Sequence, residues 1–305
     1  MVMQVGAARR RKSAPQVVRR RSVPRRCVRS STPPRLTLTR NDLATPMPKR
    51  SARRRPWFAI EAAIALFSSA HAPAWSAASC TAQSPTFVVP VVELYTSEGC
   101  NSCPPADRWL SRLKANPNVV ALAFHVDYWD RLGWKDRFAS ADYTRRQAQQ
   151  QASNGARFSY TPQIVLDGID QPRWPSLPLP GANRPHSERA ASTIDITLTR
   201  DGDQVNAVVR AKPGAPQRLA AFWALTEDGH RSDVKAGENQ GVTLQHDFVV
   251  RQFSDVPAWS AASGAPTSIR FDLDRAESPA HPASVNLVVL DAGTRRPLQA
   301  AKLGC

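Results

Sequence analysis

The chain has 305 residues, a formal net charge of +16 and 42% hydrophobic residues. Such a basic balance is typical of a nucleic-acid-binding protein. However, residues 1–56 contain 17 of the 41 Lys and Arg residues and one of the 25 acids, which leaves 24 bases and 24 acids elsewhere. The remainder is therefore neutral, and we expect no nucleic acid as its partner.

The first 78 residues predict an export signal behind a basic extension. Residues 1–46 are rich in Arg, Pro and Ser, so we expect disorder and a misassigned start. Residues 47–78 have a short basic segment, an apolar stretch and small residues for cleavage, the layout of a signal peptide. The apolar stretch of about 14 residues is shorter than the roughly 20 that span a bilayer. We predict a periplasmic or secreted protein without stable membrane insertion after cleavage.

Export would leave four cysteines, Cys80, Cys100, Cys103 and Cys305. An even number in an oxidising compartment favours disulfides, and four thiols allow three pairings. We favour Cys100–Cys103 together with Cys80–Cys305, which would join the two ends of the mature chain. Such a long loop would contribute about 5 kcal/mol in the chain-entropy model when strain is ignored.

Residues 79–189 are expected to form a thioredoxin-like domain with a Pro-rich linker at its end. An apolar run over 87–95 predicts a buried strand, and Pro104-Pro105 fits the first turn of a helix. A second strand over 119–126 would lie parallel to the first. The next expected elements are an irregular aromatic-rich segment over 127–136, a helix over 139–152 and a strand over 164–167.

Residues 190–305 are expected to form a β-rich module. Segments 193–200 and 204–210 flank Asp201-Gly202-Asp203, which predicts a β-hairpin. Further strands are predicted over 218–225, 242–250, 268–273 and 284–291. This spacing favours a mostly antiparallel β-sandwich. The predicted fold class is α/β, a thioredoxin-like domain followed by a sandwich-like module.

The Cys100-x-x-Cys103 pair lies where the first predicted strand passes into the first helix. Unpaired helix N–H groups and the helix dipole favour a thiolate there. We expect Cys100, at the helix start and more exposed, to attack, and Cys103, one turn further, to resolve the mixed disulfide. Two alternatives stay open: an inert disulfide in a binding or structural module, and a copper(I) carrier that adds His125 as a ligand.

Two further elements are candidates for the redox site. Thr161-Pro162 precedes the third strand, where Pro162 would face the thiols and Thr161 would present its backbone to an extended substrate. The isomer of this peptide bond cannot be read from the sequence. Asp107 lies on the same helix face as Cys103 and is a candidate proton acceptor for it. A solvated acid in the first turn of a helix gives the same pattern.

An aromatic segment after the second strand supplies further candidates. Trp129, Trp134 and His125 would line a substrate groove at the sheet edge where open α/β folds bind ligands. Tryptophans that cap the core and a hydrogen-bonded structural histidine give the same pattern. A structural zinc site needs four ligands, and no second Cys-x-x-Cys is present, so no metal or other cofactor is expected.

Separated motifs resemble one known family. Segments 92–107, 123–136 and 160–163, and also 146–147, 237–241 and 249–251, are similar to domain-of-unknown-function family 1223. That bacterial family of secreted, thioredoxin-like proteins implies the fold and an exported location, and carries no established activity. Asn101-Ser102 differs from the Gly-Pro of thioredoxin, so the direction of redox chemistry is not inferred. Together these features predict an exported thiol–disulfide oxidoreductase whose partners are protein thiols and disulfides or another redox protein.

Overall fold

The structure, a computed structural model, describes residues 80–181, 188–274 and 278–305. The expected basic extension and signal peptide lie outside the described residues. Within the described ranges, no helix is both long and apolar enough to cross a membrane.

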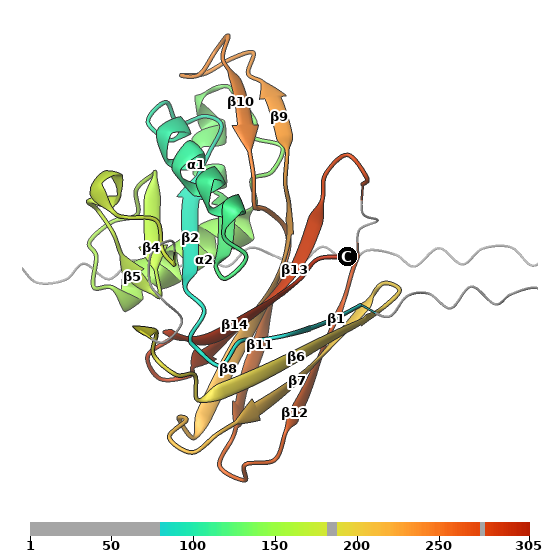
Figure 1. The fold of residues 1–305 in the computed structure, drawn as a ribbon. Helices are drawn as coiled ribbons and strands as arrows, with labels where there is room; N and C mark the ends of the chain where they lie inside the picture. The colour runs from blue at the N-terminus through green and yellow to red at the C-terminus, as the bar shows by residue number, and fades with distance from the viewer. Residues whose placement is uncertain (1–79, 182–187, 275–277) are drawn as a thin grey trace, which may run out of the picture. The chain divides into compact units, whose positions relative to one another are not determined.

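The described residues form a mixed α/β arrangement with more strand than helix (Figure 1). The strands are β1 (Cys80–Gln83), β2 (Val91–Thr96), β3 (Val120–His125), β4 (Gln163–Leu166), β5 (Ile169–Asp170), β6 (Ile194–Asp201), β7 (Gln204–Ala211), β8 (Arg218–Glu227), β9 (His230–Asp233), β10 (Thr243–His246), β11 (Val249–Ser260), β12 (Thr267–Asp272), β13 (Ala283–Asp291) and β14 (Pro297–Leu303). The α-helices are α1 (Pro104–Ser111) and α2 (Ala141–Ser153), and the 3-10 segments are η1 (Arg112–Ala115), η2 (Asp127–Leu132) and η3 (Trp174–Ser176).

An eight-stranded mixed sheet carries the site, with the strand order β14-β13-β8-β11-β3-β2-β4-β5. Strands β2 and β3 are parallel, as the sequence predicts, and β11 is parallel to β3 on its other side. The β4 strand is antiparallel to β2. The two cysteines follow the C-terminal end of β2, which lies between β3 and β4 in the sheet.

This sheet is continuous across the domain boundary expected at 189/190. Its β11–β3 pairing includes a hydrogen bond from the Ala123 N–H to the Phe248 carbonyl at 2.8 Å. Strands from the second half of the chain therefore extend the sheet that holds the thiols. The domain boundaries themselves stay a prediction.

A second sheet, with the order β1-β6-β7-β12, is antiparallel throughout. The β6–β7 pair confirms the predicted hairpin over 193–210. Apolar side chains of this sheet, such as Leu198 and Val209, pack with Trp223 of β8 and Leu287 of β13 in one buried cluster. The antiparallel half of the large sheet and this smaller sheet therefore share one buried apolar core.

The two α-helices cover opposite faces of the parallel part of the large sheet. Side chains alternate between the faces of a strand, so neighbouring residues of β2 contact different helices. Trp109 of α1 packs in one cluster with Leu94, whereas Tyr143 of α2 packs in another with Tyr95 and Phe124. This arrangement places the turn from β2 to α1 at the edge between the two layers.

The prediction of one continuous strand over 242–250 is wrong. The structure divides it into β10 and β11, and β10 pairs with β9 as a separate two-stranded hairpin. Phe248 at the break has a positive φ of 56°, which ends a strand because L residues rarely adopt it. The apolar pattern hides this break because both strands contain β-forming residues and only their partners change.

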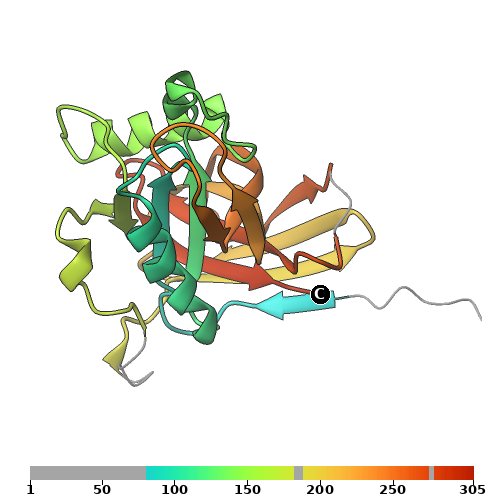
Figure 2. The same cartoon turned by 90° about the horizontal axis from the view of Figure 1, so that it is seen from above.

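A disulfide connects the ends of the described chain. It joins Cys80 at the start of β1 to Cys305 after β14, the pairing that the sequence analysis favours. Figure 2 shows the C-terminus beside β1. The bond therefore links the smaller sheet to the edge of the large one.

Replacing both Cys80 and Cys305 with Ser should lower the free energy of unfolding by up to about 5 kcal/mol, because the bond closes a loop across a sequence separation of 225. Urea denaturation measures this loss. The matched control replaces Cys100 and Cys103, which are 3 positions apart and give only about 2 kcal/mol in the same relation. Equal losses for the two pairs would contradict this explanation.

Candidate functional site

The Cys100–Cys103 disulfide lies in the turn between β2 and α1. Cys103 occupies the N-cap position, and its carbonyl accepts hydrogen bonds from the N–H groups of Ala106 at 2.8 Å and Asp107 at 3.2 Å. The prediction that Cys100 starts the helix and Cys103 lies within it is therefore wrong. Pro104 begins the helix instead, since its missing N–H and fixed φ suit the first helical position.

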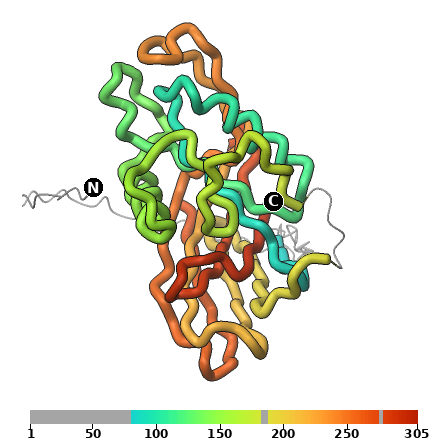
Figure 3. The backbone as a smooth tube through the Cα atoms, turned by 90° about the vertical axis from the view of Figure 1, so that its left-hand side faces the viewer, coloured from blue at the N-terminus to red at the C-terminus, as the bar shows by residue number. Residues whose placement is uncertain are grey.

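Both cysteines are fully buried, at 0% relative exposure, so the prediction of a more exposed Cys100 is also wrong. The turn between β9 and β10 covers the Cys100–Cys103 disulfide. Figure 3 shows this orange turn near the blue-green chain between β2 and α1. Asn239 Nδ2 donates to the carbonyls of Glu98 at 2.8 Å and Cys100 at 3.0 Å. Glu238 accepts a hydrogen bond from the N–H of Asn101 at 3.2 Å.

The Cys100 sulfur has polar neighbours. The Thr161 hydroxyl donates to Cys100 Sγ at 3.3 Å, and Ser102 Oγ lies 3.3 Å from the same sulfur. Trp129 Nε1 donates to Thr161 Oγ1 at 2.8 Å. Because an indole N–H can only donate, it occupies an acceptor position of the hydroxyl and leaves its proton for the sulfur. The three groups thus form a directed chain that ends on Cys100.

The Thr161–Pro162 peptide bond is cis, the isomer that the sequence left open. Helix α2 holds this loop, since Gln147 Nε2 donates to the Tyr160 carbonyl at 2.8 Å and to Gln163 Oε1 at 3.0 Å. The two contacts lie on either side of Thr161–Pro162. These two hydrogen bonds hold the loop that carries the Thr161 hydroxyl.

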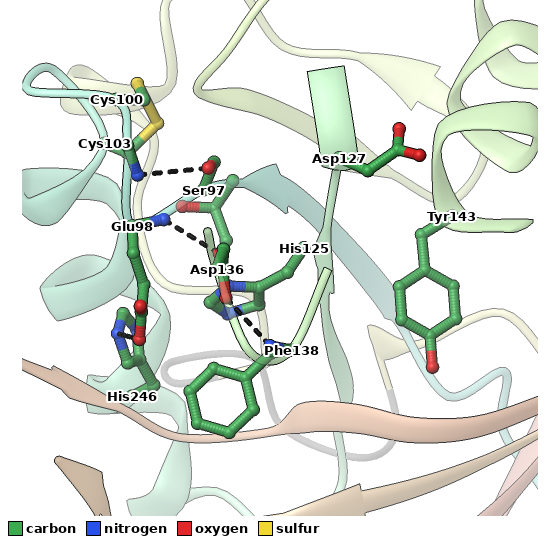
Figure 4. A network of polar contacts seen from close by, with 12 residues as sticks. Ser97, Glu98, Cys100, Cys103, His125, Asp127, Asp136, Phe138, Tyr143 and His246 are labelled. Atoms are coloured by element: carbon green, nitrogen blue, oxygen red, sulfur yellow. Dashed lines mark hydrogen bonds and ion pairs between the residues drawn. A yellow bond between two sulfur atoms is a disulfide. The ribbon is translucent and has the colours of Figure 1, made fainter. Parts of the chain in front are cut away.

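Buried charged side chains lie next to the cysteine turn (Figure 4). Asp136 Oδ2 lies 2.7 Å from His125 Nδ1 and accepts a hydrogen bond from the Glu98 N–H at 2.9 Å. Glu98 Oε2 accepts from Trp134 Nε1 at 2.7 Å, and its other oxygen lies 3.5 Å from His246 Nε2. Figure 4 shows the Glu98 side chain pointing toward His246 and away from the disulfide.

The ionisation of this cluster follows from burial and pairing. Burial alone would lower the pKa of His125, but the charge and hydrogen bond of Asp136 outweigh it and raise the pKa. Burial opposes the charged form of Asp136, yet His125 and two backbone N–H groups hold its pKa below the ordinary value. The two residues therefore form a buried ion pair. The pKa of Glu98 is also lowered, because hydrogen bonds, first from His246, outweigh burial.

Asp107 is buried rather than solvated, so the interpretation as a surface acid of the first helical turn is wrong. Its carboxylate accepts a hydrogen bond from Thr96 Oγ1 at 3.3 Å. Burial raises its pKa above the ordinary value, although the charges of His246 and His125 act in the opposite direction. A raised pKa near a thiol pair suits a group that exchanges a proton.

The structure also places the aromatic candidates. Trp129 and Trp134 are partly buried and donate their N–H groups into the site rather than line an open groove. His125 is a buried, hydrogen-bonded histidine. Within the described ranges, no three or more His, Cys, Asp or Glu side chains are arranged to hold a metal ion. The copper(I) alternative, with Cys100, Cys103 and His125, thus has no preformed ligand set there.

Four residues of the site were not predicted from the sequence. Asp136 and His246 complete the charged cluster, and Glu238 and Asn239 cover the disulfide. The family-like segments 123–136 and 237–241 contain Asp136, Glu238 and Asn239, and this resemblance could have identified them. No local pattern distinguishes His246, because its partner lies on another element.

Comparisons with known proteins identify one family and two similar solved structures. The model of a family described as "Protein of unknown function (DUF1223)" matches residues 91–290. Protein AGR_C_4864 from Agrobacterium tumefaciens has 25% identity and a TM-score of 0.52, over 72% of this chain and 95% of its own. HBP35 of Porphyromonas gingivalis has 12% identity and a TM-score of 0.51, over 72% and 76%, a likeness of fold alone. No curated protein matches the chain.

Replacing Asp136 with Asn should lower the free energy of unfolding by about 3 kcal/mol, since it leaves one partner of a buried pair without its countercharge. The pKa of His125 is raised, so its contribution to the stability of the fold is fully present below its ordinary pKa of 6.5. The pKa of Asp136 is lowered, so its contribution is fully present above its ordinary pKa of 3.8. The loss should therefore be largest between these values and shrink as the pH rises through the pKa of His125. Urea denaturation across this range measures it.

The control is Asp203→Asn, because Asp203 is exposed in the turn between β6 and β7. It should leave the stability unchanged at every pH. A loss for Asp136→Asn that does not vary with pH would reject the ion pair.

Proposed function

Because the chain belongs to the DUF1223 family of proteins of unknown function, we propose a function from its site: a thiol–disulfide oxidoreductase that acts through Cys100 and Cys103. Strands β2, β3 and β4 with helix α1 would form its thioredoxin-like unit. The disulfide at the start of α1 and the Thr161–Pro162 loop in contact with it support this proposal.

The observation that carries the proposal is the directed hydrogen bond from Thr161 to Cys100 Sγ. A hydroxyl donor favours the thiolate over the thiol once the disulfide is reduced. Trp129 orients this donor from the other side. A purely structural disulfide does not require an oriented hydrogen-bond donor at one of its sulfurs.

In the proposed reaction, the Cys100 thiolate attacks a disulfide of a partner polypeptide. A mixed disulfide forms, and one partner sulfur leaves as a thiolate. Cys103 then loses its proton and attacks Cys100 Sγ, which forms the Cys100–Cys103 bond and releases the second partner thiolate. Two electrons pass from the cysteine pair to the partner, and the reverse sequence oxidises a partner dithiol.

Asp107 is the proposed acceptor of the Cys103 proton. It follows Cys103 by one turn of α1, and its N–H donates to the Cys103 carbonyl at 3.2 Å. Burial raises the pKa of its carboxyl, which favours uptake of a proton at a less acidic pH than usual. The same group would return this proton in the reverse direction.

We extend the proposal to an oxidising compartment outside the cytoplasm, with protein thiols and disulfides or another redox protein as partners. Support comes from the two disulfides, which are typical of exported proteins. The neutral balance of residues 57–305 favours no polyanionic partner.

A second candidate function is a binding or structural module with an inert disulfide. The complete burial of both cysteines favours it, because a catalytic thiol has to meet its partner. The two candidates differ in how easily the bond is reduced and in whether a partner sulfur can be captured.

The reduction potential of Cys100–Cys103, measured against glutathione mixtures, distinguishes these candidates. An oxidoreductase should have a potential above about −300 mV, whereas structural disulfides of secreted proteins lie below it. Cys103→Ser should trap a mixed disulfide with a peptide disulfide, and Cys100→Ser should not. A potential below the limit, without trapping, would sink the oxidoreductase proposal.

Replacing Thr161 with Val should slow the reaction of reduced Cys100 with a peptide disulfide about 10-fold, because it removes a hydrogen bond to a charged sulfur worth at least about 1.4 kcal/mol. Stopped-flow kinetics of the reduced protein measure the rate. Thr161→Ser keeps the hydroxyl and should restore most of it. Equal rates for the Val and Ser variants would show that the hydroxyl has no part in activation.

A further inference from the structure

We propose that the turn 237–241 between β9 and β10 is an access gate for the Cys100–Cys103 site, with Asn239 as its latch. This proposal rests on the proposed function for its purpose, although access to the disulfide can be measured without it. The turn lies over a site that a partner polypeptide would have to reach.

The latch is one buried amide with two acceptors. Asn239 is 5% exposed, and its Nδ2 donates to the carbonyls of Glu98 and Cys100, on either side of Gly99. From the other direction, a Cβ at Gly99 would lie 3.2 Å from Trp129 Cβ, so Trp129 closes against the same turn. The cysteine turn is thus held between Asn239 and Trp129.

The β9–β10 hairpin is separate from the large sheet in its strand pairing, although Arg137 Nη2 donates to the Arg231 carbonyl of the hairpin at 2.9 Å. Its strands pair only with each other among the described strands, through four residue pairs. The base is fixed, since Gly229 N–H donates to Asp247 Oδ1 at 2.9 Å and Phe248 N–H donates to Asp228 Oδ1 at 2.7 Å. The far end contacts the cysteine turn through side chains at 238 and 239.

The turn itself is internally bonded, so it can move as one piece. The N–H of Gln240 donates to the Gly237 carbonyl at 3.2 Å, and the N–H of Val242 donates to the Asn239 carbonyl at 3.0 Å. Gly237 and Gly241 have positive φ values of 75° and 82°, which glycine adopts without strain. Release of the latch therefore need not unfold the turn.

Closure of the hairpin leaves two polar atoms beneath it unpaired. His246 of β10 faces His125 of β3, with ring centroids 4.9 Å apart. Within the described part of the chain, His125 Nε2 and His246 Nδ1 are buried without a hydrogen-bond partner. Burial of these unpaired atoms costs free energy, whereas the contact of His246 with Glu98 at 3.5 Å favours closure. The contacts of Asn239 and Glu238 would offset this cost and hold the closed state.

Opening would also create a recognition surface. It would free the carbonyls of Glu98 and Cys100 and the N–H of Asn101, all beside the attacking sulfur. The backbone of an extended polypeptide has the donors and acceptors to replace these contacts, whereas a small thiol does not. The gate would therefore favour a disulfide in an extended segment of a protein over low-molecular-weight disulfides.

The test is the rate at which tris(2-carboxyethyl)phosphine reduces the disulfide in Asn239→Asp and in the wild type. The phosphine takes oxygen from water, and each disulfide becomes two thiols, which are alkylated and assigned by peptide mass spectrometry. The Asp side chain has nearly the same shape but places an acceptor against two carbonyls. We expect reduction of Cys100–Cys103 to become at least about 10-fold faster, since two hydrogen bonds are lost.

Two comparisons isolate the gate from a general loss of structure. Cys80–Cys305 in the same molecule should be reduced at an unchanged rate. Asn206→Ala, at an exposed position of β7, should leave both rates unchanged. Glu238→Ala removes only the contact with Asn101 and should give a smaller acceleration than Asn239→Asp.

The gate is overturned if folded Asn239→Asp reduces Cys100–Cys103 within twofold of the wild-type rate. If Asn239→Asp does not fold, as judged by circular dichroism, Glu238→Ala decides: acceleration supports the gate, and an unchanged rate rejects it. The reduction potential and trapping experiments judge the proposed function separately. A gate that opens over a pair unable to trap a partner would reject the oxidoreductase and retain the gate.

Discussion

The carboxylate of Asp136 is the interaction on which the site depends. One oxygen meets both the His125 ring from β3 and the N–H of Glu98 from the cysteine turn, and the other accepts from the Phe138 N–H. A buried carboxylate is stable only with such compensation. Asp136 adds a side-chain link between the cysteine turn and β3, beyond the pairing of β2 with β3.

Local patterns were enough to predict much of the framework. The alternation over 193–210 predicts the β6–β7 hairpin, and the apolar runs over 87–95 and 119–126 predict a parallel pair, since each signal lies within one segment. The break at Asp247-Phe248 could not be predicted, because it depends on which strand each half pairs with. Strand propensity contains no information about which strand a segment pairs with.

The site was predicted less completely than the framework, for the same reason. The sequence identifies Cys100, Cys103 and the Thr161–Pro162 loop from local motifs. It cannot reveal that both sulfurs are buried, because the covering residue Asn239 lies 139 positions from Cys100. The His246–Glu98 contact likewise joins distant elements. Exposure is a tertiary property, and motif spacing contains no information about it.

The connection between β8 and β11 has one more consequence. These strands are antiparallel neighbours, and Glu227 stands opposite Val249, so a short reverse turn would be enough to join them. The chain instead makes an excursion of residues 228–248 before it returns to the same pair. This detour supplies Glu238 and Asn239, which cover the disulfide, and His246, which contacts Glu98 of the cysteine turn. One stretch between two neighbouring strands thus contributes both to the cover of the disulfide and to the charged cluster beneath it.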